Sequence, residues 1–207
     1  MKRLLLLVLV SGYFLSSSMA QEIELTGFGG FTFNSKIRTY YGDYKVNDNP
    51  NYGGILSVGL APDVFVELMY NRHDSKIRYA YTPGIIQPLD MATEYYHVGG
   101  LTQIPVGSGN IKPFGAVSFG ATRFYLKESY GNLYSASEWK MSAAVGVGTK
   151  ILLGNALGIR LQARLGLPLD FNGLWIGTGG SGANFRVPMV QFDLSAGLIL
   201  RLGGGGA

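Results

Sequence analysis

Hydrophobic and polar residues alternate with a period of two along most of the chain, as they do in β-strands with two different faces. The clearest segment is 158–167, in which every odd position is apolar and every even position is Gly, Arg or Gln. The segments 22–33, 52–60, 64–71, 139–151 and 190–202 repeat this pattern. Segments 93–104 and 112–125 alternate less cleanly, so their faces stay unassigned. The pattern predicts eight β-strands.

The connections between these segments alternate in length. The short ones are 61–63, 105–111 and 154–156, and the long ones are 35–50, 73–92, 126–137 and 169–186. Successive antiparallel hairpins place their turns at alternate ends, so we expect all short connections at one end and all long ones at the other. A hairpin hidden in a long connection would raise the count to ten strands.

Composition decides which kind of barrel the pattern favours. Hydrophobic residues make up 47% of the 207 residues, charged residues only 14%, and there are 31 glycines. A water-soluble lipocalin-like barrel would carry more charge on its outer face, whereas an outer-membrane barrel turns an apolar face outward. Tyrosines near the long connections are typical of an interfacial girdle: Tyr52, Tyr70, Tyr95, Tyr96 and Tyr125. We therefore predict an all-β fold, an eight-stranded antiparallel transmembrane up-and-down β-barrel.

The N-terminus has the pattern of a secretory signal peptide. Lys2 and Arg3 precede the apolar run 4–10, and small residues follow at Ser18 and Ala20. We predict a cleaved signal over residues 1–20 and a barrel domain over 21–207, located in the outer membrane of a diderm bacterium. The absence of cysteine excludes disulfides and thiolate metal sites, and the formal charge of +4 is too small to favour nucleic-acid binding.

Two stretches carry a resemblance to a known group of proteins. The glycine-rich run Gly27-Phe28-Gly29-Gly30-Phe31 and the ending 195–202 resemble those of small outer-membrane β-barrels, which include the OmpA transmembrane domain, OmpX and OmpW. The ending looks like the signal that the barrel assembly machinery recognises. The resemblance implies that this machinery, outer-membrane lipids and lipopolysaccharide are partners. The oligomeric state stays open.

An eight-stranded barrel has an interior just wide enough to be filled by side chains. The alternation places charges of both signs in it, namely Glu22, Glu24, Glu67, Asp193, Lys140, Lys150, Arg160, Arg164 and Arg201. Such charges must pair, because an unpaired charge in that space is costly. One interpretation is a structural network that plugs the lumen. The alternative is a gate, in which Glu67 exchanges Arg160 and Arg164 as partners.

Other motifs give little support for catalysis or cofactor binding. His73-Asp74-Ser75 has the residue types of a hydrolase triad, but His73 and Ser75 share one face of an extended chain and Asp74 points away. We therefore expect the solvated entrance of a loop there, not a lipid A-modifying enzyme. The run 177–182 matches G-x-G-x-x-G without a following helix, and Asp43, Asn47, Asp48 and Asn49 lack the spacing of a calcium loop. No cofactor, metal or enzymatic activity is predicted.

The long connections are rich in aromatic and small polar residues, a composition that binding loops also use. The candidate contact residues are Tyr40, Tyr41, Tyr44, Tyr130, Tyr134 and Trp175. The leading hypothesis is a non-enzymatic surface or envelope protein whose external loops bind a ligand or partner. The alternative is a narrow channel for ions or small apolar solutes.

Overall fold

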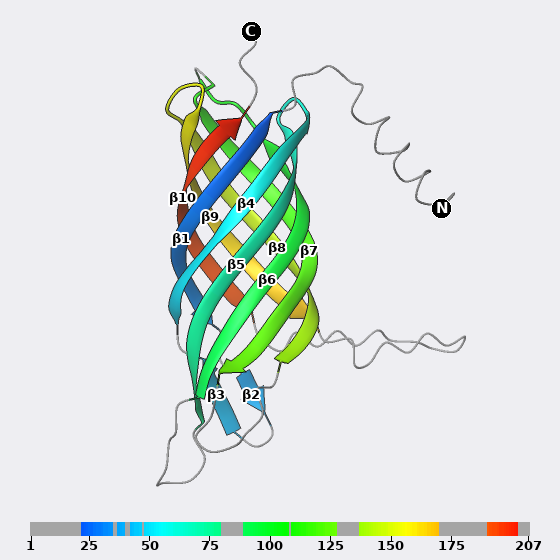
Figure 1. The fold of residues 1–207 in the computed structure, drawn as a ribbon, viewed down its shortest axis with the longest axis vertical. Coiled ribbons are helices and arrows are strands. Elements are labelled where there is room, and N and C mark those ends of the chain that lie inside the picture. Colours follow the sequence, from blue (N-terminus) through cyan, green and yellow to red (C-terminus); the bar gives the residue numbers. More distant parts are fainter. Residues whose placement is uncertain are drawn as a thin grey trace, which may run out of the picture.

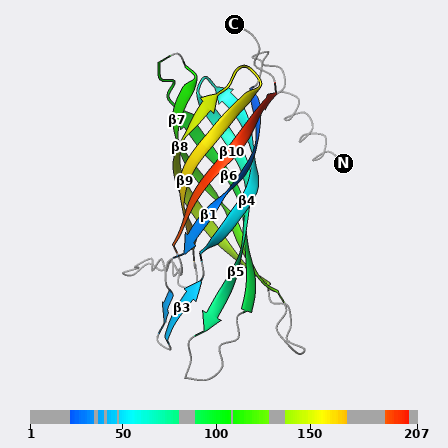
Figure 2. The ribbon, with the colours of Figure 1, turned by 90° about the vertical axis from the view of Figure 1, so that its left-hand side faces the viewer.

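A computed structural model describes residues 22–34, 37–39, 42–46, 48–79, 89–107, 109–127, 137–169 and 190–202. Eight antiparallel strands close into a barrel, as the sequence predicts (Figures 1 and 2). They are β1 (Ile23–Asn34), β4 (Asn49–Ala61), β5 (Val64–Tyr79), β6 (Leu89–Gln103), β7 (Ile111–Lys127), β8 (Ser137–Leu152), β9 (Leu157–Leu169) and β10 (Gln191–Leu202). The expected signal peptide lies outside the described residues.

The ring closes because β1 pairs with both β4 and β10, and β5 pairs with β6. Short turns join β4 to β5, β6 to β7 and β8 to β9 at the end where β1 begins and β10 finishes, which is uppermost in Figure 1. We call this the turn end and the opposite one the loop end. The arrangement confirms that short and long connections lie at opposite ends.

Two further strands lie inside a segment that the sequence suggested to be a connection. The strands β2 (Ile37–Thr39) and β3 (Gly42–Val46) form a hairpin, and β3 continues the sheet along β5 beyond the end of β4. The strands β5 and β6 also run further than expected, so the connection between them shrinks from residues 73–92 to residues 80–88. The barrel therefore carries an extension of its sheet at the loop end.

Alternation along the strands separates an apolar exterior from a polar interior. Leu68 on β5, Val147 on β8 and Leu198 on β10 are 54%, 64% and 71% exposed on the outer wall. Glu24, Thr26 and Thr32 of β1 are at most 1% exposed, since they point into the lumen. Within the described ranges, no helix is long and apolar enough to cross a membrane.

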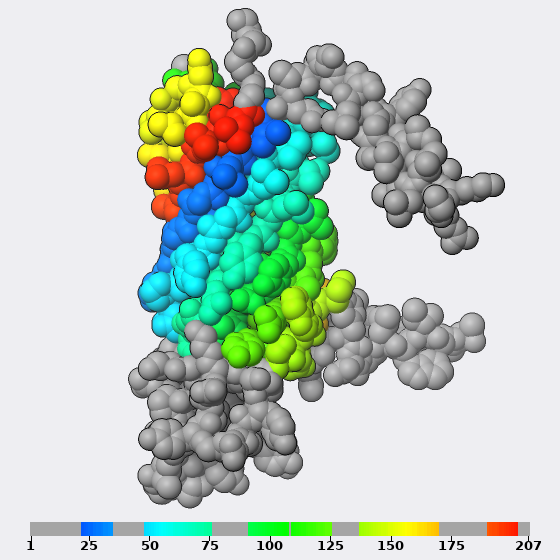
Figure 3. Space-filling model, viewed as in Figure 1, coloured from blue at the N-terminus to red at the C-terminus, as the bar shows by residue number. Residues whose placement is uncertain are grey.

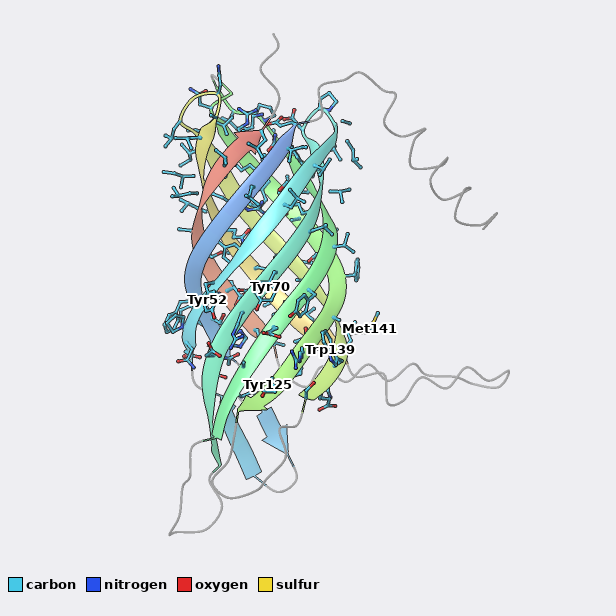
Figure 4. The ribbon with its side chains drawn as sticks, viewed as in Figure 1. Tyr52, Tyr70, Tyr125, Trp139 and Met141 are labelled. Atoms are coloured by element: carbon cyan, nitrogen blue, oxygen red, sulfur yellow. The ribbon has the colours of Figure 1, made fainter. Side chains whose placement is uncertain are left out.

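Aromatic side chains gather on the outer wall toward the loop end. Figure 4 shows Tyr52, Tyr70, Tyr125 and Trp139, with Met141 beside them, in a band across several strands. We call these four aromatic residues the aromatic band. Trp139 and Tyr52 are more than half exposed. The prediction that Tyr95 belongs to this girdle is wrong. Its strand neighbour Tyr96 faces outward, so Tyr95 points into the lumen, where it is 2% exposed.

Candidate functional site: the lumen and the charged row on the outer wall

Three acid–base pairs follow one another along the lumen from the turn end toward the loop end. Lys150 Nζ lies 2.5 Å from Oε2 of Glu24. Arg160 donates from Nη1 and Nη2 to the two carboxylate oxygens of Glu67, at 2.6 and 3.0 Å. Arg164 Nη2 lies 2.5 Å from Oδ2 of Asp193. All six side chains are at most 10% exposed.

The pair between Arg160 and Glu67 spans the width of the barrel. Arg160 is on β9 and Glu67 on β5, and these strands lie opposite each other in the ring of eight. Ser57 of β4 donates a further hydrogen bond of 2.8 Å to Glu67. The guanidinium also stacks on the Phe114 ring, 4.5 Å from its centroid. Long side chains therefore tie opposite walls together through the centre.

A second cross-link lies nearer the turn end. Lys150 of β8 reaches Glu24 of β1, three strands away around the ring. Its ammonium group sits 4.1 Å from the centroid of the Phe65 ring, which packs with Leu101 and Phe114 in a small apolar cluster. At the rim of the turn end, Arg201 pairs with Glu22. Charged groups and rings thus fill this half of the lumen.

Asp193 is the hub of the third level. It accepts hydrogen bonds from Thr32 Oγ1 at 2.6 Å, from Asn71 Nδ2 at 3.3 Å, and from Nε and Nη2 of Arg164. Asn51 in turn donates to Thr32 at 2.9 Å. These contacts join β1, β4, β5, β9 and β10. The structure therefore places Glu67 with Arg160, and Arg164 with Asp193.

A polar cluster with two histidines continues the lumen toward the loop end. His97 lies 3.0 Å from Ser118 Oγ and 2.7 Å from Ser142 Oγ. The ring of His73 stacks near that of Tyr95, and its Nε2 atom lies 3.2 Å from Gln191 Nε2. Tyr95 also hydrogen bonds to Gln191. Because the faces of 93–104 were unassigned, sequence reasoning missed His97 and placed Tyr95 in the girdle instead of the lumen.

The expectation of a solvated loop entrance at His73-Asp74-Ser75 is wrong. Strand β5 continues past these residues, so the pleat turns His73 and Ser75 into the lumen, where they are at most 3% exposed. Asp74 points to the outer face and pairs there with Arg72 at 3.0 Å. The three side chains do not converge on one point, as the extended geometry predicts.

Only a small space is left beside the central ion pair. A cavity of about 30 Å³ lies among Glu67, Arg160 and Arg164 and against the small residues Ala116 and Gly146. This is room for one or two water molecules. The arrangement can hold water beside the charges of Glu67, Arg160 and Arg164.

A second cluster of charges lies on the outer wall, and sequence reasoning missed it. Cross-strand register aligns Tyr52, Arg72, Glu94, Arg123 and Trp139 in one row across β4 to β8. Arg72 Nη1 lies 3.0 Å from Glu94 Oε1, and Arg123 Nη1 lies 3.5 Å from Oε2. We call Arg72, Glu94 and Arg123 the charged row. The signal was hidden because the three charges lie on three different strands, and only the register brings them together.

The remaining candidate residues fall partly outside the described residues. This holds for Tyr40, Tyr41, Tyr130, Tyr134 and Trp175, while for Tyr44 only the backbone, in β3, is described. Among the described residues there is no group of three or more His, Asp or Glu side chains that would hold a metal ion. Binding through the external loops therefore stays a prediction.

Solved structures resemble this barrel over most of its length. Neisserial surface protein A superposes with a TM-score of 0.59 at 11% identity, covering 87% of this chain and 97% of its own. The chain has the fold of the small outer-membrane β-barrels. OprG of Pseudomonas aeruginosa, an outer membrane protein, gives 0.55 at 12% identity, with 89% and 97% covered. Ail, the attachment invasion locus protein of Yersinia pestis, gives 0.50 at 14%, with 88% and 99% covered.

Comparison of sequences finds no related protein in addition to these structures. A scan against protein-family models finds no match, and a search of curated proteins finds none. The likeness is therefore one of fold, and the function has to be argued from this chain's own residues.

Proposed function

We propose that this chain is an integral outer-membrane protein with a closed lumen and a non-enzymatic role at the cell surface. The observation that carries the proposal is the central cross-link, in which Arg160 and Glu67 join opposite walls of the barrel. A lumen filled in this way is a poor route for solutes. Function is then expected at the loop end, where a ligand or partner binds to the segments beyond the barrel.

The outer wall supports the membrane location. Large apolar side chains such as Leu68, Val147 and Leu198 are exposed around the ring, and a soluble protein rarely leaves so much continuous apolar surface in water. The aromatic band adds the interfacial belt expected near the loop end (Figure 4). By analogy with such barrels, the turn end faces the periplasm and the loop end the outside.

The sheet extension supports a role at the surface. Register pairs Tyr44 with Tyr79 and Val46 with Ile77, so the β2–β3 hairpin is held by β5 beyond the aromatic band. This places Tyr44, one of the predicted contact residues, at the loop end. One structural relative is named an attachment invasion protein, which is consistent with binding at this position.

Epitope tags test both the location and the orientation. A tag inserted between Tyr79 and Leu89 should be labelled by antibody on intact cells, because this connection is at the loop end. The matched tag in the turn 153–156 should be labelled only after the outer membrane is opened. If only the turn tag were labelled on intact cells, the barrel would have the reverse orientation, and this would contradict the proposed surface role.

Binding itself is tested by replacing the β2–β3 hairpin, residues 37–46, with a Gly-Ser linker. Cells that display the unaltered chain should adhere to at least one component of an array of glycans and matrix proteins, and the replacement should abolish that adherence. Adherence equal to that of cells lacking the chain would contradict the proposal.

One observation favours a channel as the second candidate function. The small cavity touches Glu67, Arg160 and Arg164 together, so an exchange of partners by Glu67 would need only local side-chain movement. If this exchange forms a gate, Glu67→Gln should change single-channel conductance, while Glu22→Gln at the rim should not. Identical traces from folded Glu67→Gln and unaltered barrels would eliminate the gate.

A further inference from the structure

Among the side chains that the structure describes, charge on the outer wall of the barrel gathers in one sector. Among the described side chains, the outward-facing charges toward the loop end belong to β5, β6 and β7, namely Arg72, Asp74, Glu94 and Arg123. Across the barrel, β1, β9 and β10 present Phe31, Phe33, Leu165 and Phe192 instead. Ionised groups on a lipid-facing wall are costly, so a localised cluster calls for a function.

The charged row is rigidly built. Glu94 is only 9% exposed, and its carboxylate also accepts hydrogen bonds from Tyr70 at 3.3 Å and Tyr96 at 3.1 Å. The two arginine side chains beside it are partly exposed, Arg72 to 26% and Arg123 to 35%. Arg123 lies against Tyr125 and Trp139, with ring centroids 5.1 and 5.8 Å away. The row therefore presents oriented donors at the level of the aromatic band.

An apolar groove begins directly beside the row. It is shallow and open to the outside, has a volume of about 520 Å³, and runs over the outer faces of β1 and β4 to β7. Tyr70 and Tyr96 form its border with the charges, while Leu56, Leu68, Val98 and Phe119 line it further toward the turn end. Figure 3 views this face of the barrel. The apolar groove and the charged row are therefore adjacent, like the apolar part and the polar part of an amphiphile.

We propose that this sector binds a phosphorylated glycolipid of the outer leaflet, of the lipid A type. An acyl chain fills the groove, and Arg72 and Arg123 donate to the phosphate at the level of the aromatic band. Asp74, 44% exposed beside Arg72, accepts hydrogen bonds from sugar hydroxyls. A sugar head group explains why carboxylates stand among the arginines, since a simple anionic phospholipid offers them fewer donors. The inference rests on the proposed membrane location, which the epitope tags test separately.

The test uses the full barrel, refolded in detergent and verified by its gel mobility, with fluorescent lipid A as the probe. The variant Arg72→Gln/Arg123→Gln should weaken binding about tenfold, as expected for lost charge-assisted hydrogen bonds. Lys112→Gln, a basic residue at the turn end, should bind like the unaltered chain. Dephosphorylated lipid A and phosphatidylglycerol should compete poorly with the probe.

A second variant tests the groove without touching a charge. Gly54 lines the groove, and a Cβ there meets only Thr26 O at 3.7 Å, an ordinary contact. Gly54→Leu should fill the groove and weaken binding, whereas Gly115→Leu, an outward position with open space outside the groove, should not. Unchanged binding by folded Arg72→Gln/Arg123→Gln, or equal competition by phosphatidylglycerol, would overturn the proposal.

Discussion

Replacing Arg160 with methionine should lower the free energy of unfolding by about 3–5 kcal/mol, because it removes the cation that pairs with the buried Glu67 carboxylate. The same change removes both hydrogen bonds to Glu67 and the contact with the Phe114 ring. Urea unfolding in lipid vesicles, followed by the fluorescence of the tryptophans, measures the effect. The loss should be among the largest that a single side chain in this lumen produces.

The double variant Arg160→Met/Glu67→Gln distinguishes loss of charge balance from loss of packing. With the carboxylate neutralised, no unpaired charge remains, and the glutamine keeps an acceptor for Ser57. Most of the stability lost in Arg160→Met should return. A double variant as unstable as Arg160→Met would mean that packing of the long side chain, rather than its charge, holds the two walls together.

Gly53→Ala should cost about 3 kcal/mol or more, or prevent folding, because the lumen wall has no space for a methyl group there. A Cβ at Gly53 would lie 2.0 Å from the backbone oxygen of Tyr70 and 2.7 Å from the Phe28 ring. The ring can turn, but the backbone of the paired strand cannot move away without breaking the ladder. Only glycine at position 53 therefore leaves room for the Phe28 ring.

Gly54→Ala is the matched control for Gly53→Ala. It lies one residue further along β4 and on the outer face, where a Cβ makes only an ordinary contact at 3.7 Å. This variant should fold like the unaltered chain or be slightly more stable, since alanine restricts the unfolded state. Heat-modifiable mobility on gels compares the two variants. Equal folding of Gly53→Ala and Gly54→Ala would show that the wall adapts to the methyl group.

The strands and the direction of the inward charges could be predicted because a period of two governs most of the chain. In residues 158–167 every arginine falls on one face, and β9 indeed turns Arg160 and Arg164 into the lumen. Which charges meet could not be predicted, because Arg160 reaches across the ring to β5 while Arg164 pairs with its neighbour on β10. Which partner each arginine reaches depends on how far neighbouring strands are shifted along one another.

Strand β6 shows why the charged row and the lumen position of Tyr95 could not be predicted. Polar residues occur on both of its faces, with His97 in the lumen and Glu94 on the outer wall. The charge of Glu94 is balanced by Arg72 and Arg123 from the neighbouring strands, so β6 taken alone gives no reason to place a glutamate outside. The same ambiguity led to Tyr95 being assigned to the girdle.

Single-channel conductance of the purified barrel in a planar bilayer tests the closed lumen most directly. Folding is first verified by the mobility difference between boiled and unboiled samples. The cross-links from Arg160 to Glu67 and from Lys150 to Glu24 predict a membrane with no discrete openings. Reproducible openings from the unaltered, folded chain would contradict a closed lumen and make the channel its function.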